Sequence, residues 1–182
     1  GVEISQMTDW PEKLAAIAQR TRALDITLIA GIPSWLLVLA EALRPGGSRG
    51  SSRPPSLQQT VWPNLECLVH GGVPLGPFHG ELRRAFGPAV HFHEVYPASE
   101  GFIAAQDATA AEGLRLMTDA GLFFEFLPMK DFDVNEIGKL TRKAVPIEAV
   151  RPNQDYVLVL TTPAGLCRDV VGDVERFVST VP

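Results

Sequence analysis

The residues best suited to chemistry lie in the stretch Val90–Gln106, where Tyr96, Ser99 and Glu100 surround Pro97. Apolar and polar residues alternate up to the proline, and an apolar run follows the glutamate. This pattern predicts a strand, a tight loop and a second strand, with Tyr96, Ser99 and Glu100 at the loop. A loop held between two strands can present a carboxylate to a ligand. An ordinary hairpin with a solvated glutamate explains the same pattern.

A second candidate contact is His70-Gly71-Gly72, which follows the apolar run Leu65–Val69. Paired glycines directly after a strand let the backbone approach a ligand closely. A turn that needs a positive φ angle explains the same residues equally well. Gly71 and Gly72 are therefore candidate ligand contacts, with a plain turn as the alternative.

Two further patterns are weak. His91 and His93 share one face of a predicted strand, but Glu94 points to the other face, and two histidines are too few for a zinc site. The low-complexity stretch Arg44–Ser56 is rich in glycine and serine. It lacks a Walker lysine and follows a helix instead of a strand, which argues against a phosphate-binding loop.

The elements that must position the candidate residues alternate in the first half of the chain. A helix capped by Thr8 or Asp9 comes first. Ile26–Ala30 is a continuous apolar run, which predicts a strand buried on both faces. The run Trp35–Leu43 predicts a helix whose apolar residues belong to the core. The remaining predicted elements of this half are the strand Leu65–Val69 and the helix Leu82–Phe86. This order predicts right-handed crossovers and a mainly parallel sheet.

The second half of the chain changes to a β pattern. Apolar runs separated by turn signals predict these strands: Gly113–Thr118, Gly121–Leu127, Tyr156–Thr161 and Val174–Val178. No helix of comparable strength lies between them, so we expect antiparallel pairing. The predicted fold is α/β, with a helix-flanked, partly parallel sheet in residues 1–106 and a mainly antiparallel β part in residues 107–182.

Composition excludes several classes of protein. The chain has 182 residues, of which 46% are hydrophobic and 20% charged, so it can bury a sizeable core. A net charge of −5 argues against a protein that neutralises nucleic-acid phosphates. No window reaches the roughly 20 apolar residues of a membrane span. Cys67 and Cys167 lie far apart without metal-ligand spacing, which favours reduced thiols and a cytoplasmic protein.

An ordered set of short segments resembles a known family. The segments are Trp62-Pro63-Asn64-Leu65, His70-Gly71-Gly72, Tyr96-Pro97-Ala98-Ser99-Glu100, Gly121-Leu122-Phe123-Phe124-Glu125-Phe126, Leu160-Thr161-Thr162-Pro163-Ala164-Gly165-Leu166 and Val171-Gly172-Asp173. Their order resembles the auxin-responsive family of acyl-acid-amido synthetases, within the adenylate-forming superfamily of acyl-CoA synthetases and luciferases. The resemblance covers nearly the whole chain and favours a functional role for Glu100.

The resemblance implies ATP-dependent activation of a small carboxylic acid and transfer of the acyl group to an amino acid. It implies that Tyr96 lies beside the adenine and that Glu100 engages magnesium and the phosphates. It also implies that Asp173 accepts hydrogen bonds from the ribose hydroxyls, and that Ser99, Gly71 and Gly72 contribute to the nucleotide site. A coenzyme A ligase of the same superfamily and a non-catalytic binding module are the alternatives.

The sequence departs from the family pattern in two ways. Val170 stands where the last motif has an arginine, and Arg168 lies two places earlier. The family's phosphate loop is expected upstream of Gly1, and its small C-terminal domain with the catalytic lysine after Pro182. We therefore expect a fragment of the large N-terminal domain, inactive alone, whose partner is the remainder of its own chain. The resemblance also places part of the acyl pocket around Ile32–Leu43.

Overall fold

The structure is a computed structural model that describes residues 2–44, 54–107, 113–136 and 141–180. Its contacts divide the chain into two compact units, Gly1–Val95 (unit 1) and Tyr96–Pro182 (unit 2). From the sequence, the division was expected after Gln106. The packing divides the chain earlier because Ile103 and Ala104 belong to the core of unit 2. Most of the low-complexity stretch Arg44–Ser56 lies outside the described residues.

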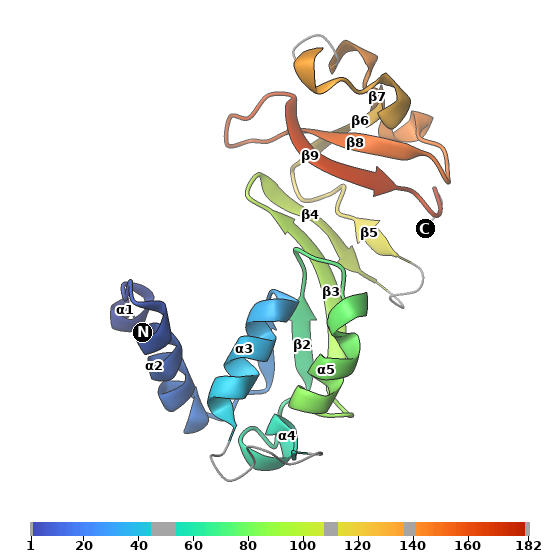
Figure 1. The fold of residues 1–182 in the computed structure, drawn as a ribbon. Coiled ribbons are helices and arrows are strands. Elements are labelled where there is room, and N and C mark those ends of the chain that lie inside the picture. The colour runs from blue at the N-terminus through green and yellow to red at the C-terminus, as the bar shows by residue number, and fades with distance from the viewer. Residues whose placement is uncertain (1, 45–53, 108–112, 137–140, 181–182) are drawn as a thin grey trace. The chain divides into compact units, whose positions relative to one another are not determined.

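Unit 1 alternates helices and strands (Figure 1). The helices are α1 (Val2–Ser5), α2 (Trp10–Arg22), α3 (Pro33–Leu43), α4 (Leu57–Thr60) and α5 (Gly76–Phe86). The strands are β1 (Leu28–Gly31), β2 (Cys67–His70) and β3 (His91–Ala98), the last of which continues into unit 2. β1 pairs with β2, and β2 with β3, in parallel, with Leu68 opposite Ile29 and Phe92. The predicted parallel sheet is confirmed.

Local chemistry explains where the helices begin. Asp9 caps α2, because its Oδ1 accepts a hydrogen bond of 2.8 Å from the backbone N–H of Glu12. Pro33 and Pro77 stand in the first turns of α3 and α5, where a missing N–H costs nothing. α5 starts at Gly76, earlier than the predicted Leu82, so the proline opens this helix.

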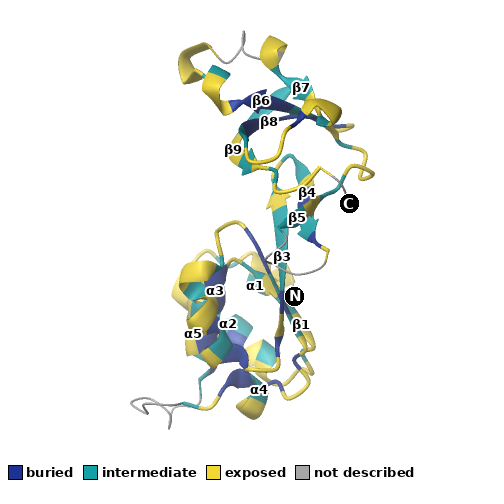
Figure 2. Ribbon diagram, turned by 90° about the vertical axis from the view of Figure 1, so that its right-hand side faces the viewer, coloured by how far each residue is buried: buried dark blue, intermediate teal, exposed yellow. Residues whose placement is uncertain are grey.

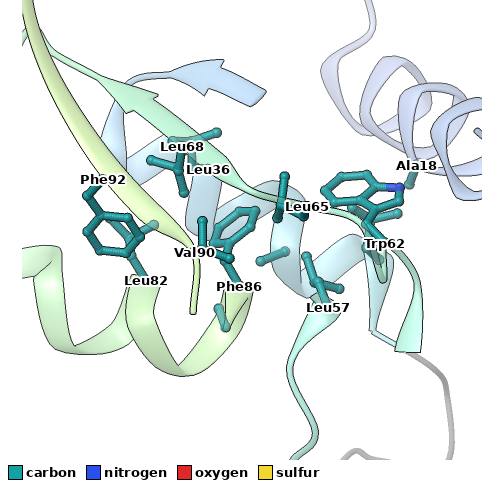
Figure 3. Close-up of a cluster of buried hydrophobic side chains, with 13 residues drawn as sticks. Ala18, Leu36, Leu57, Trp62, Leu65, Leu68, Leu82, Phe86, Val90 and Phe92 are labelled. Atoms are coloured by element: carbon teal, nitrogen blue, oxygen red, sulfur yellow. The ribbon is translucent and has the colours of Figure 1, made fainter. Parts of the chain in front are cut away.

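The core of unit 1 lies between the sheet and α3 to α5. Figure 3 shows Leu68 and Phe92 from the strands facing Leu82 and Phe86 of α5. Trp62 is also buried, and its Nε1–H donates a hydrogen bond of 3.0 Å to the carbonyl oxygen of Thr21. These contacts tie α2 to the core, although α2 itself buries little.

Two predictions about the core of unit 1 were wrong. Trp35 was expected in the core but is 49% exposed, and it packs edge-on against Trp10 with ring centroids 4.7 Å apart. β1 was expected to be buried on both faces, yet Leu28 is 55% exposed. Among the described residues β1 pairs with β2 alone, so its other edge lacks a strand.

Unit 2 is a β structure, as predicted. Its strands are β4 (Gly101–Gln106), β5 (Leu114–Leu116), β6 (Phe123–Pro128), β7 (Val145–Pro146), β8 (Asp155–Thr161) and β9 (Asp169–Arg176). β4 pairs antiparallel with β5, and the other four form an antiparallel sheet in the order β7-β6-β8-β9. Short 3-10 turns connect β6 to β8, at Met129–Asp131, Val134–Glu136, Thr141–Lys143 and Ile147–Ala149.

The core of unit 2 is built on β6 and β8, which Figure 2 shows as largely buried. Phe126 and Tyr156 each pack edge-on against Phe177. The predicted α/β fold, partly parallel and then antiparallel, is confirmed. No described helix is long and apolar enough to cross a membrane.

Candidate functional site

Two of the predicted site residues meet in unit 2. The hydroxyl of Tyr96, near the end of β3, donates a hydrogen bond of 2.5 Å to Oδ2 of Asp173 on β9. The two residues are 77 positions apart in the sequence. Tyr96 is half-buried while Asp173 is exposed, so the carboxylate is held from one side and open from the other. The fold thus brings together two motifs that the sequence analysis had linked only by resemblance.

Tyr96 lies in a strand, which corrects the predicted break. β3 continues through Pro97 to Ala98, and the turn consists of Ser99 and Glu100 alone. Pro97 is exposed, and a proline is tolerated in a strand where its missing N–H is not needed for pairing. Ser99 is exposed and Glu100 is half-buried. The tight loop is therefore present, with Glu100 at its tip and Tyr96 in the strand before it.

A β-bulge places Asp173 beside Tyr96. Val157 of β8 pairs with Val174 of β9, whereas Val159 pairs with Val170, so β9 has extra residues between these pairs. Gly172 lies in the bulge with φ of 90°, a conformation that costs little only for glycine. Bulges change the direction of the side chains beside them, and here the neighbouring side chain is Asp173.

The electrostatics of this contact involve one more acid, Glu175. Burial raises the pKa of Tyr96, and so do its hydrogen bond to Asp173 and the charge of Glu175, so the phenol stays neutral. Burial is the largest effect on the pKa of Glu175 and raises it. The hydrogen bond with Tyr96 lowers this pKa and the charge of Asp173 raises it, so that the pKa as a whole is raised. Glu175 was not among the residues predicted for the site. The available signal was its place two residues after Asp173, inside the predicted strand Val174–Val178.

Gly71 and Gly72 lie in unit 1, at the end of β2. Gly71 is buried, and Gly72 has φ of 81°, so the turn by itself accounts for glycine at position 72. Beside them His70 is 1% exposed, and its Nδ1 has no hydrogen-bond partner among the described residues. Burial, with smaller effects from His93 and His79, lowers the pKa of His70. A neutral imidazole thus lies at the carboxyl end of a parallel strand, where ligands of α/β sheets commonly bind.

Arg168 takes a structural position. Its Nε and Nη2 donate hydrogen bonds of 2.9 and 2.8 Å to the two carboxylate oxygens of Glu125 on β6. Its backbone N–H donates to Oγ1 of Thr161, and its φ of 52° turns the chain into β9. Arg168 therefore anchors the connection between β8 and β9 to the sheet.

Unit 1 also contains a hollow of about 350 Å³ between α2, β1 and α3. Trp35, Leu36 and Leu39 line it, so part of the segment proposed for an acyl pocket does border an open space. Its walls are mainly apolar, and Trp10 and Leu14 close the side formed by α2.

Comparison with known proteins shows which family the second half of the chain resembles. Residues 115–182 match the sequence profile of the GH3 family central domain. This region contains Asp173, Glu175 and the bulge at Gly172. The match thus covers most of β5 and all of β6 to β9.

Solved structures share the fold over most of the chain. The structure of GH3.15 acyl acid amido synthetase covers 95% of it with a TM-score of 0.64 and 15% identity. That of AtGH3.15 acyl acid amido synthetase in complex with 2,4-DB covers 90%, with a TM-score of 0.59 and 16% identity. An open conformation of 2-hydroxyisobutyryl-CoA ligase, in complex with 2-HIB-AMP and CoA, covers 92%, with a TM-score of 0.58 and 17% identity.

The chain spans 38%, 34% and 35% of the lengths of these three structures. The resemblance predicted from the sequence motifs is confirmed for residues 115–182, which match the central domain of the GH3 family, and the chain shares its fold with the two GH3.15 structures and the CoA ligase structure.

Proposed function

We propose that this chain carries the nucleotide-binding core of an ATP-dependent ligase, which adenylates a carboxylic acid and transfers the acyl group to an amino acid. The observation that carries the proposal is the hydrogen bond between Tyr96 and Asp173, because it unites the two motifs that the family uses for the nucleotide. The chain spans about two fifths of the length of the first matched synthetase, so turnover is proposed for a longer polypeptide that includes residues 1–182.

Asp173 is suited to bind a ribose. A carboxylate only accepts hydrogen bonds, and Tyr96 occupies one of its oxygens, so the other oxygen and the remaining lone pairs can accept from two adjacent hydroxyls. The Tyr96 ring would then lie beside the adenine. Ser99, Gly71 and Gly72 are the proposed additional nucleotide contacts.

Glu100 is the proposed magnesium ligand. Magnesium usually binds through one or two carboxylates plus substrate phosphates and water, so a single carboxylate suffices on the protein side. The half-buried Glu100 at the tip of the turn meets this requirement. Among the described residues there is no group of three or more potential ligands that would form a protein cage, which is consistent with a site completed by phosphates. When bound, the ion would neutralise phosphate charge.

The reaction has two steps. A carboxylate oxygen of the acid attacks the α-phosphorus of ATP, and the bond to pyrophosphate breaks. The amine nitrogen of the amino acid then attacks the acyl carbon, loses a proton and displaces AMP. The first step requires in-line positioning and charge stabilisation at phosphorus, and the second requires the amine to be positioned against the acyl carbon. Neither needs covalent chemistry by the protein. The residues of unit 2 would supply nucleotide positioning, and the apolar hollow of unit 1 is the proposed contact for the acyl group.

Transfer to coenzyme A is the second candidate, favoured by the shared fold with 2-hydroxyisobutyryl-CoA ligase. The product distinguishes the two. Incubation of the longer polypeptide with ATP and mixed acids, with amino acids in one reaction and coenzyme A in another, should yield amides and not thioesters by mass spectrometry. Nucleotide binding without either product would favour a binding module.

The direct test of the site is Asp173→Asn, measured as AMP affinity by calorimetry. Loss of the charge-assisted hydrogen bonds should weaken binding by about 1.5–3 kcal/mol per strong bond, while the melting temperature stays close to that of the wild type. Asp119→Asn, at an exposed position of the same unit, is the matched control and should bind normally. An unchanged AMP affinity in Asp173→Asn would remove Asp173 from the site.

A further inference from the structure

The parallel sheet of unit 1 has one covered face and one exposed face. Side chains alternate along a strand, and parallel partners lie side by side, so each face consists of rows that cross β1, β2 and β3. The covered face includes Leu68, 0% exposed, and Phe92, 8% exposed, and it packs against α3 and α5. The opposite face, called the open face below, has two rows: Leu28, Cys67 and His91, then Ala30, Val69 and His93.

The open face has the composition of a surface that is normally covered. Leu28 is 55% exposed, Ala30 is also exposed, and Cys67 and Val69 are half-buried. Its six residues include no aspartate, glutamate, lysine or arginine. A sheet face that meets water usually carries polar residues, whereas parallel sheets have helices on both faces. The open face therefore resembles the second buried face of a parallel sheet, without its helices.

The topology explains why the helices of unit 1 leave this face uncovered. The three parallel strands follow one another in the order β1-β2-β3. α3 lies in the crossover from β1 to β2, and α5 in the crossover from β2 to β3. Right-handed crossovers that run in one direction place their helices on the same side of a sheet, and Figure 2 shows α3 and α5 together on one side of the strands. In doubly wound folds the other face is covered by chain that winds in the opposite direction.

We propose that the open face binds helices from the part of the longer polypeptide outside residues 1–182. The length of the matched synthetase supports this occupant, because the alignment covers 95% of this chain but only 38% of that structure. The partner surface should be an apolar helix face. It should carry a hydrogen-bonding residue opposite His91 and His93, whose rings lie 6.1 Å apart at the β3 side. The proposal rests on the longer polypeptide of the proposed function and is independent of nucleotide binding.

Cys67 reports on the open face because it lies on β2, the middle strand of the three. Its reaction with a maleimide is followed by mass spectrometry in the 182-residue chain and in the longer polypeptide. Cys167→Ser in both proteins removes the second thiol, which is exposed in unit 2. Burial raises the pKa of the Cys67 thiol, which slows the reaction, so each rate is divided by the rate in urea-unfolded protein at the same pH.

We expect Cys67 of the 182-residue chain to react within about tenfold of the unfolded rate, since a half-buried thiol needs little local opening. In the longer polypeptide the same thiol should react more slowly by a further factor of about 100, because the covering helices must open before the reagent can enter. The difference between the two proteins measures the cover over this face.

Val69→Thr supplies a second readout, because it places a hydroxyl on the open face with little change of shape. In the 182-residue chain the urea midpoint should stay near that of the wild type, since water still reaches the hydroxyl. In the longer polypeptide the midpoint should fall and Cys67 should react faster, because the hydroxyl becomes buried without a partner. Val38→Thr, at a position of α3 that is 40% exposed, is the matched control and should change neither measurement.

The outcomes also separate this inference from the proposed function. Equal normalised rates for Cys67 in the two proteins would overturn the proposal, whether or not AMP binds. Slow reaction in the 182-residue chain that quickens on dilution, together with a dimer in analytical ultracentrifugation, would assign the open face to a second copy and would also overturn it. A protected Cys67 in a longer polypeptide that forms no adenylate would remove the proposed function and support the covered face.

Discussion

Glu100 and Asp173 are both carboxylates of unit 2, yet their surroundings differ. Asp173 is held by the Tyr96 hydroxyl, whereas Glu100 lies in a two-residue turn that leaves it half-buried. Asp173 is thus preorganised before any ligand arrives, whereas under the proposed function Glu100 would gain its partners only when the metal and the phosphates bind. The effects of mutation should differ accordingly, with Asp173 governing affinity and Glu100 governing rate.

Glu100→Gln in the longer polypeptide tests the second half of this expectation. The variant keeps the shape and removes the charge, so the transition state loses one electrostatic stabiliser. We expect pyrophosphate release to slow by about 100- to 1000-fold, equivalent to about 2.7–4 kcal/mol. Its melting temperature should stay near that of the wild type, since surface substitutions usually change stability by no more than about 0.5 kcal/mol.

A hairpin with a solvated glutamate makes the opposite prediction for the same variant, namely unchanged pyrophosphate release. Melting temperature and release are therefore measured on one preparation, with Glu148→Gln as the matched control. Normal release from a stable Glu100→Gln protein would exclude Glu100 from the site.

At the scale of elements, the bulge of β9 links stability to the site. Gly172 has φ of 90° and open space around the position of a β-carbon, so the backbone angle, and not crowding, demands glycine. Gly172→Ala should cost about 1–2 kcal/mol of folding free energy, measured by urea unfolding. It should also weaken AMP binding, because the relaxed bulge would move Asp173 away from Tyr96.

Gly80 offers a matched glycine-to-alanine control with the opposite sign. It lies inside α5, where the nearest atom to an added β-carbon is Nη1 of Arg84 at 3.8 Å. Gly80→Ala should therefore stabilise unit 1 by about 0.5–1 kcal/mol and leave AMP affinity unchanged. Equal effects of the two substitutions would contradict the role given to the bulge.

Most elements could be predicted from the sequence, and the misses have physical causes. Capping and helical spacing predicted α2, because Asp9 acts locally, and the apolar run Trp35–Leu43 predicted α3, which begins at Pro33. Pro97 was predicted to break the strand, because proline has no backbone N–H to donate. Whether β3 needs a donor at this position depends on the strand beside it, which the periodicity of the sequence does not reveal. Glu175 was missed for a related reason: its contact with Tyr96 depends on the bulge, which the sequence indicates only through Gly172.

At the scale of the molecule, the two units have different chemistry. Tyr96, Ser99, Glu100 and Asp173 all lie in unit 2, while the proposed glycine contacts and the apolar hollow lie in unit 1. The sequence predicted the change from parallel to antiparallel pairing, because crossover helices disappear after Gln106. It did not predict the exposure of Leu28, since a continuous apolar run looks the same whether or not both faces of the strand are covered.

The shared fold covers 38% of the length of the GH3.15 synthetase structure, from which we predict that residues 1–182 alone do not catalyse adenylation. ATP–pyrophosphate exchange by the 182-residue chain should be undetectable, whereas AMP binding to unit 2 should be measurable. Detectable exchange would show that the rest of a synthetase is dispensable for the first step.

The contact between Trp10 and Trp35 gives the protein an optical signature. Two indole rings with centroids 4.7 Å apart are close enough for their electronic transitions to couple, and we expect a paired positive and negative band in circular dichroism. The pair joins the start of α2 to the start of α3, so the band reports directly on the packing of these helices. Since both rings are about half exposed, a molecule that enters the neighbouring hollow would change the band without any added label.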